Sequence, residues 1–201
     1  MAAVSETMVR EYFELHGFFV RQQRKYVAPA RSPEDEEADF FILNPLYETG
    51  AKPPPFLLTS NDLAGVARAI VVVKGWHTET FSPARLAQVP EIFRFLEPLA
   101  FQQAARAFGR DGPLLKIMVV PALPQGAEAR AKSVEVLRGK GIDAIIPFRA
   151  MLTDLIAQIE ANRNYQKSDL LQVIRILKNY DFLKDAQLEL FKAKKKSPKR
   201  P

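Results

Sequence analysis

One apolar segment constrains the fold more than any other part of the chain: residues 68–76 read RAIVVVKGW. Its β-branched residues predict a strand, and the apolar run does not alternate with polar residues. A strand of this kind is buried on both faces, which is typical of a sheet covered by helices on each side. The sequence therefore favours an α/β fold, and its 201 residues are enough for one sizeable core.

Four further strands and several helices are expected around this segment. The other strands are predicted at 18–27, 39–45, 114–123 and 141–148. Helices are predicted at 5–16 with Ser5 as N-cap and Gly17 after its end, at 82–108 with a break at Pro98, at 126–138, at 149–161 and after Ser168. The first three strands follow one another directly, whereas helices precede the last two. We therefore predict a mixed central sheet flanked by helices, with the early strands in a meander and the later ones parallel.

The net charge of +6 is concentrated at one end of the chain. Residues 192–201, KAKKKSPKRP, contain six basic residues and no acidic one, and the remaining 23 Lys and Arg balance 23 Asp and Glu. This segment has no apolar face to bury, so we predict a disordered basic tail. Such a tail either binds DNA or RNA weakly or serves only as a solubilising end.

Composition also limits the environment and the domain organisation. There is no cysteine, which excludes disulfides and thiolate metal sites. No signal peptide and no bilayer-spanning segment are expected, so the prediction is a cytoplasmic protein without a membrane partner. The predicted organisation is an α/β core at 1–148, a C-terminal helical extension at 149–191 and the basic tail at 192–201.

Two residues with catalytic potential occupy strand ends in this order of elements: Asp39 opens the second strand and Lys74 follows the apolar run. Over residues 5–148 the chain resembles the PD-(D/E)XK phosphodiesterase superfamily, which has the restriction-endonuclease-like fold. The resemblance implies a catalytic site made of Asp39, Lys74 and a glutamate of the first helix, Glu11 or Glu14. It also implies Mg²⁺ as cofactor, with Asp39 as metal ligand.

The sequence departs from the family pattern at Val72, where an acidic residue is expected two positions before Lys74. Side chains two apart on a strand share a face, so an acid there would lie beside the lysine and help Asp39 to hold Mg²⁺. Valine supplies no oxygen ligand. Mg²⁺ binds through as few as one or two carboxylates with water and phosphate, so Asp39 alone predicts weak binding. The acids considered as substitutes are Glu37, Glu79, Glu91 and Glu97.

A basic strand segment is the main nucleic-acid candidate outside this motif. Arg21, Arg24 and Lys25 lie in the first predicted strand beside an aromatic residue, and such a strand can follow a phosphate backbone. A charged sheet edge that resists aggregation explains the same residues. Trp76 is a candidate for base stacking, with packing at the core or its rim as the alternative.

Three functions are compatible with these features. The first is a nuclease-fold protein with a degraded catalytic site that acts as a nucleic-acid-binding or interaction module, with DNA or RNA as partner. The second is an active Mg²⁺-dependent DNA phosphodiesterase with a displaced acidic ligand. The third is a protein-interaction α/β domain that forms a homo-oligomer by dimerising through its C-terminal helices.

Overall fold

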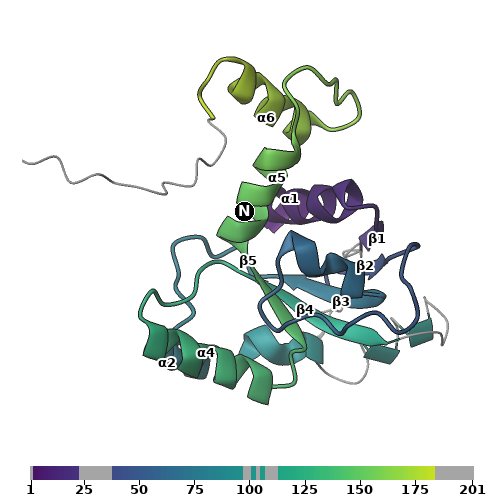
Figure 1. The fold of residues 1–201 in the computed structure, drawn as a ribbon. Helices are drawn as coiled ribbons and strands as arrows, with labels where there is room; N and C mark the ends of the chain where they lie inside the picture. Colours follow the sequence, from purple (N-terminus) through teal and green to yellow (C-terminus); the bar gives the residue numbers. More distant parts are fainter. Residues whose placement is uncertain (1, 23–37, 97–100, 103–104, 107–112, 184–201) are drawn as a thin grey trace, which may run out of the picture. The chain divides into compact units, whose positions relative to one another are not determined.

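The computed structural model describes residues 2–22, 38–96, 101–102, 105–106 and 113–183 (Figure 1). The chain divides into two compact units, Met1–Leu155 and Ile156–Pro201. In chain order the elements are α1 (Ala2–Leu15), β1 (Phe19–Gln22), β2 (Phe40–Leu43), the 3₁₀ helix η1 (Ser60–Gly65), β3 (Arg68–Val73), α2 (Pro83–Gln88), the 3₁₀ helix η2 (Pro90–Leu96), β4 (Leu114–Val120), α4 (Ala127–Gly139), β5 (Ala144–Pro147), α5 (Phe148–Gln158) and α6 (Asp169–Asn179). None of the helices in the described part of the chain has the length and hydropathy needed to span a bilayer.

The sheet has five strands in the order β1-β2-β3-β4-β5. The first two pairings are antiparallel and the last two, β3 with β4 and β4 with β5, are parallel. Antiparallel neighbours need no crossover helix, whereas parallel neighbours need a crossover, which α2 with η2 and then α4 provide. The predicted α/β class, the mixed sheet and the parallel later strands are confirmed.

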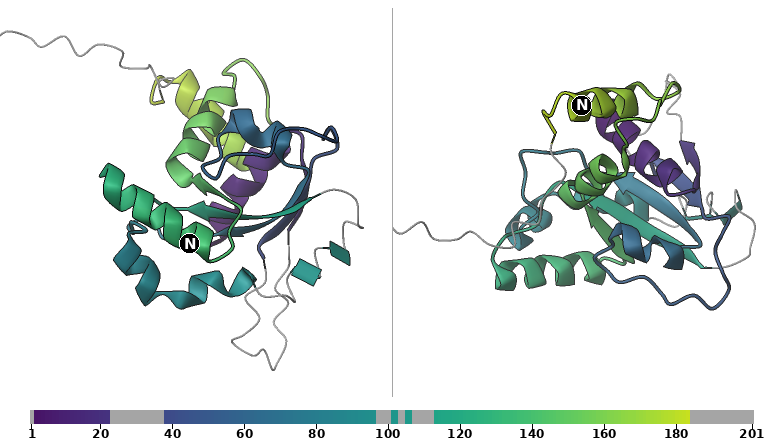
Figure 2. Two further views of the ribbon diagram at one scale, coloured as in Figure 1. Left: turned by 60° about the horizontal axis from the view of Figure 1, so that its bottom comes forward. Right: turned by 45° about the horizontal axis from the view of Figure 1, so that its top comes forward.

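Helices cover both faces of this sheet (Figures 1 and 2). On one face, Ile70, Val72 and Met118 belong to a hydrophobic cluster with residues of α2, η2 and α4. The alternate strand residues, among them Val71, point to the other face, where α1 packs against β1 and β3. All but the last residue of β3 are buried, which confirms that the segment is an interior strand.

Local sequence signals explain several helix ends. The Ser168 hydroxyl accepts a hydrogen bond from the Leu171 amide and caps α6, as predicted. After α1, Gly17 adopts a φ of 82° while the Phe18 amide donates to the Phe13 carbonyl, which is a Schellman arrangement.

Several predicted boundaries are wrong. Helix α1 begins at Ala2, so Ser5 is a buried residue within the helix rather than its N-cap. Strand β3 ends at Val73, not at residue 76. The helix expected from residue 82 is already interrupted at Val89, because a residue before proline is driven out of the helical region. Pro98, where the break was predicted, lies outside the described residues.

Candidate functional site

The strand ends next to Asp39 and Lys74 lie on the same side of the sheet. Strand β2 is antiparallel to β3, so β2 begins where β3 ends, and the parallel strands β4 and β5 end at the same edge. Asp39 precedes β2 and Lys74 follows β3, so both residues lie at this edge. The sequence predicted this neighbourhood, and the structure brings the two strand ends together.

Asp39 joins the end of β3 to the start of β2. Its backbone amide donates to the Val71 carbonyl at 2.9 Å, and its Oδ2 accepts a hydrogen bond from the Val73 amide at 2.7 Å. The residue is 8% exposed, so these bonds lie largely away from water. The carboxylate therefore takes the place of a backbone acceptor just before the first residue of β2.

Val72 is part of the core and is 3% exposed. It lies beside Met118 in the parallel register and belongs to the cluster covered by α2, η2 and α4. Across the described residues, no group of three or more His, Asp or Glu side chains is placed to hold a metal ion. Val72 thus supplies no oxygen ligand at the position where the resemblance to the PD-(D/E)XK superfamily implies a second carboxylate.

Lys74 lies just beyond β3. Its amide donates to the Val119 carbonyl at 3.0 Å, which extends the pairing with β4, and the residue is half-buried. Residues 72 and 74 share a strand face wherever the extended conformation continues. The end of this strand therefore has a half-buried lysine, with a core valine two residues before it.

The two candidate glutamates belong to α1, which covers the face opposite to the Val72 cluster. Glu11 is buried, and its Oε1 accepts a hydrogen bond from the Arg10 guanidinium at 3.2 Å. Glu14 is more exposed and lies 4.0 Å from the same guanidinium. Partial burial raises the pKa of Glu14 and the neighbouring Glu11 raises it further, while Arg10 opposes both effects. Both glutamates pair locally with Arg10 in this structure.

The segment after Lys74 is fixed by contacts with α1 and with the loop before α2. A Cβ atom on Gly75 would lie 2.6 Å from the Ser5 hydroxyl oxygen, so only glycine permits this close approach without a shift. The Ser5 hydroxyl also hydrogen-bonds to Nε2 of His77 at 2.9 Å. Trp76 packs edge-on against Phe81, with ring centroids 5.9 Å apart.

Trp76 and the basic strand residues were predicted to contact nucleic acid. The Trp76 ring packs against the hydrophobic cluster, and the Arg85 guanidinium lies 5.7 Å from the ring centroid. Arg21 is exposed on β1, at an edge of the sheet. Arg24 and Lys25 lie outside the described residues. Base stacking by Trp76 and phosphate contacts by the three basic residues remain predictions.

Of the acids considered as substitutes, Glu79 forms an ion pair with Arg85 at 3.0 Å and Glu91 begins the first turn of η2. Glu37 and Glu97 lie outside the described residues. Within the part of the chain that the structure describes, these acids form no group of three or more potential metal ligands with Asp39.

Sequence reasoning missed a pocket at the ends of β4 and β5. Its charged residues are Arg130 in the second turn of α4 and Arg149 in the first turn of α5. The available signal was the position of Pro121 and Pro147 where two apolar strands stop, each followed by a helix with an early arginine. Only the parallel pairing of β4 and β5 places these segments side by side.

Comparison of the chain with protein-family models, with curated proteins and with solved structures finds no match in any of the three. The resemblance to the PD-(D/E)XK superfamily accordingly remains a prediction from element order and from Asp39 and Lys74.

Proposed function

We propose that this chain is a nucleic-acid-binding domain with a nuclease-like order of elements and no working metal-dependent catalytic centre. The proposal rests on the contacts that the side chains of Val72 and Asp39 make at the adjacent ends of β3 and β2. Val72 packs in the hydrophobic core, and one carboxylate oxygen of Asp39 accepts a hydrogen bond from the Val73 amide. Mg²⁺ prefers near-octahedral oxygen coordination, and this arrangement supplies too few protein oxygens for tight binding.

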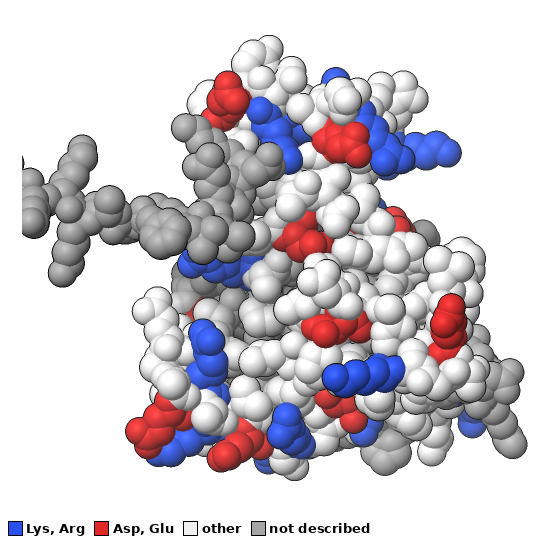
Figure 3. All heavy atoms as spheres, viewed as in Figure 1, with Lys and Arg blue, Asp and Glu red and all other residues white. Residues whose placement is uncertain are grey.

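Charge supports binding that is weak and independent of base sequence. Arg21 is exposed on the edge strand β1, and the sequence places six basic residues at 192–201. On the face shown in Figure 3, Lys and Arg of the described residues are interspersed with Asp and Glu and form no large patch of one sign. We therefore expect few phosphate contacts and a shallow salt dependence.

Fluorescence anisotropy with labelled duplex and single-stranded DNA tests this proposal. The full chain is expected to bind in a salt-dependent manner, and a chain lacking residues 192–201 is expected to retain measurable binding. Arg21→Ala should lower the slope of log K against log salt by about one unit, the effect of one lost phosphate contact. Lys132→Ala on α4 removes an equal charge outside β1 and serves as the matched control.

A cleavage assay on plasmid DNA with Mg²⁺ or Mn²⁺ completes the test. No cleavage above background is expected, with Lys74→Ala indistinguishable from the unmodified chain. Metal-dependent cleavage that Lys74→Ala abolishes would establish the active phosphodiesterase instead. Loss of all binding on removal of residues 192–201 would exclude the folded domain as the nucleic-acid-binding part.

A second candidate function, self-association through the C-terminal helix, is favoured by the exposed side of α6. Leu171 and Ile174 are buried, whereas Val173, Ile176 and Tyr180 are 51%, 44% and 70% exposed. These three residues follow one another at helical spacing and form an apolar stripe. Monomers seldom leave such a stripe uncovered.

The order of residues along the stripe fits a second copy of this chain. In an antiparallel pair of α6 helices related by a two-fold axis, Val173 would face Ile176 of the other copy. The same register places Asp169, which opens the helix on this side, opposite Tyr180, where a carboxylate can accept a hydrogen bond from a phenol. A stripe that matches itself in this way is what an isologous interface requires.

Sedimentation equilibrium over a range of protein concentrations tests this pairing. The unmodified chain is expected to show a reversible dimer. Ile176→Lys should shift it to monomer, because it would place two lysines in the interface between the paired α6 helices. Asn179→Lys adds the same charge to the same helix outside the stripe and should leave the dimer intact. A monomer at all concentrations, or equal effects of the two variants, would rule out pairing through α6.

A further inference from the structure

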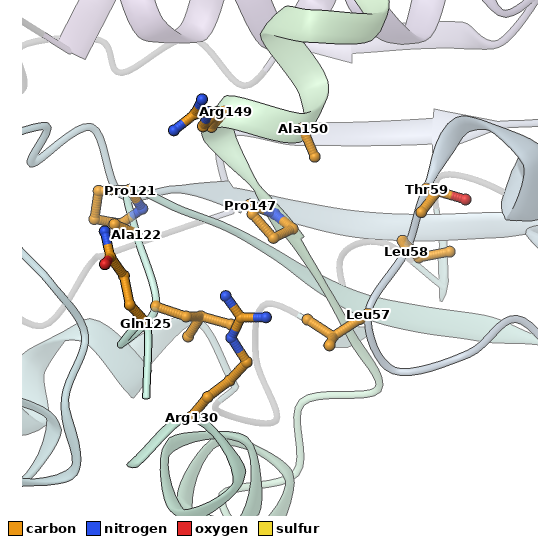
Figure 4. A pocket seen from close by; sticks show the side chains of 11 residues that line it. Leu57, Leu58, Thr59, Pro121, Ala122, Gln125, Arg130, Pro147, Arg149 and Ala150 are labelled. Atoms are coloured by element: carbon orange, nitrogen blue, oxygen red, sulfur yellow. The ribbon is translucent and has the colours of Figure 1, made fainter. Parts of the chain in front are cut away.

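A pocket of about 320 Å³ lies at the carboxyl ends of the parallel strands β4 and β5 (Figure 4). It is open to solvent on one side and takes its lining from three separated parts of the chain. The lining residues are Leu57, Leu58, Thr59, Pro121, Ala122, Leu123, Gln125, Arg130, Pro147, Arg149 and Ala150. In α/β sheets the crevice beyond the carboxyl ends of the strands is the usual place for small ligands.

The lining combines an apolar wall with two positive charges. Leucine, proline and alanine side chains form most of the surface, and none of the lining residues is acidic. The guanidinium of Arg130 extends into the space between Leu57 and Gln125, and Arg149 lies across the pocket at the start of α5 (Figure 4). The pocket therefore places two cations beside apolar surface without a carboxylate in its lining to neutralise them.

Arg130 is held in position by the backbone of the preceding loop. Its Nε donates to the Pro124 carbonyl at 3.2 Å, which leaves the two terminal nitrogens of the guanidinium for another acceptor. Among the residues that the structure describes, no carboxylate pairs with the Arg149 guanidinium. An arginine fixed in this way loses less side-chain freedom when an anion binds.

The N-terminal ends of α4 and α5 add positive electrostatic potential to that of the two arginines. Pro147 ends β5 and α5 begins at the next residue, so Arg149 and Ala150 belong to the first turn of a helix. Helix α4 begins after Gly126, which provides no side-chain cap for its first amides. First-turn amides lack intrahelical acceptors, and the dipole makes this end of a helix partly positive.

We propose that this pocket binds a small organic anion, with its phosphate or carboxylate group on the Arg130 guanidinium, an apolar body against Leu57 and Leu123, and additional positive charge from Arg149 across the pocket. Arginine suits both head groups because its planar guanidinium donates paired hydrogen bonds to two oxygens. The apolar wall excludes a bare inorganic ion as the preferred occupant, since such an ion would leave that surface uncovered. The site is separate from the nucleic-acid surface proposed for β1.

Titration calorimetry with three matched probes tests the proposal: phenyl phosphate, benzoate and benzyl alcohol. The two anions are expected to bind and the neutral alcohol to bind at least tenfold more weakly, since about 1.4 kcal/mol separates each factor of ten. Inorganic phosphate, as a fourth probe, should bind more weakly than phenyl phosphate because it lacks the apolar body. Phenyl phosphate against benzoate distinguishes the two possible head groups.

Variants locate the binding on the two arginines. Arg130→Ala is expected to weaken anion binding about tenfold, the effect of losing one charge-assisted hydrogen bond, and Arg149→Ala is expected to weaken it less, because it removes a charge across the pocket. Arg130→Lys should weaken it less because it keeps the charge. Lys132→Ala, on the same helix and outside the pocket, should leave it unchanged. Thermal unfolding of each variant verifies that the domain is folded.

Three results would overturn the proposal. One is the absence of binding by both anionic probes. Another is equal binding of benzyl alcohol and benzoate, which would make the pocket a purely apolar site. The third is a loss of affinity in Lys132→Ala as large as in Arg130→Ala. Anion binding would then depend on the overall charge of the protein and not on the pocket.

Discussion

Val72→Glu is expected to destabilise the domain by about 3–5 kcal/mol rather than to complete a metal site. Val72 is 3% exposed and packs with Ile70 and Met118 under α2 and α4. A carboxylate at this position would lose its hydration within an apolar cluster, and the pKa of the new glutamate would rise until much of it is protonated. A protonated or displaced glutamate is a poor ligand for Mg²⁺.

Urea unfolding followed by circular dichroism measures this change, with and without Mg²⁺. Val72→Thr is the matched control because threonine has nearly the same shape and introduces one hydroxyl; we expect it to lose about 1–3 kcal/mol. The unfolding midpoint of Val72→Glu should not rise when Mg²⁺ is added. A stable Val72→Glu variant that gains both Mg²⁺ binding and DNA cleavage would show instead that a working metal site lies one substitution away.

The order of elements along the chain, the mixed sheet and the parallel pairing of the later strands followed from patterns in the sequence. The apolar run at 68–73 lacks alternation, and burial on both faces is the physical consequence of that pattern. Helices between the later strands are long enough for crossovers, which parallel pairing requires. Capping by Ser168 was equally predictable, because a hydroxyl satisfies first-turn amides wherever a helix begins.

Boundaries were less predictable where tertiary contacts decide them. Pairing with β2 ends at Val71, opposite Phe40, and the Val73 amide donates to the side chain of Asp39 in place of a strand partner. β3 ends at Val73, although the Lys74 amide still donates to the Val119 carbonyl of β4. The start of α1 at Ala2 follows the burial of Ser5 against Gly75 and His77, a contact between segments about 70 residues apart in sequence.

The sequence predicted which strand ends form the candidate site, but not which atoms its side chains contact. The resemblance to the PD-(D/E)XK superfamily implied that Asp39 lies near Lys74, which follows β3. Which atoms it contacts depends on the register of β2 against β3, which no sequence pattern specifies. The pairing of Glu11 with Arg10 likewise depends on the rotation of α1 over the sheet. The pocket between Arg130 and Arg149 escaped prediction because it forms only after β4 and β5 are paired.

Asp39→Ala is expected to destabilise the domain by about 2 kcal/mol, whereas Asp39→Asn should lose about half as much or less. The physical reason lies in the Val73 amide, which donates to Asp39 Oδ2 at 2.7 Å in a nearly buried position. Alanine leaves that amide without its acceptor, so the folded state loses stability by the free energy of desolvating an unpaired amide. Asparagine retains a carbonyl oxygen at the same position and gives up only the charge.

The contrast between these two substitutions separates a structural role from metal binding. A carboxylate that serves mainly as a metal ligand would make Asn and Ala equally harmful to Mg²⁺ affinity, and both would be harmless to stability in EDTA. A carboxylate that joins two strands predicts the opposite: unequal stabilities in EDTA and little response to Mg²⁺. Urea unfolding in the two buffers gives the stabilities.

Hydrogen exchange at a single amide provides the site-specific measurement. The Val73 amide is expected to exchange faster in Asp39→Ala than in Asp39→Asn, because local opening at the end of β3 no longer breaks a hydrogen bond. The Lys74 amide, which donates to Val119 on the other side of the strand, is the internal control and should change less. Equal protection of the Val73 amide in both variants would mean that Asp39 does not join the strands. The carboxylate would then be available for the metal chemistry that its position in the sequence suggests.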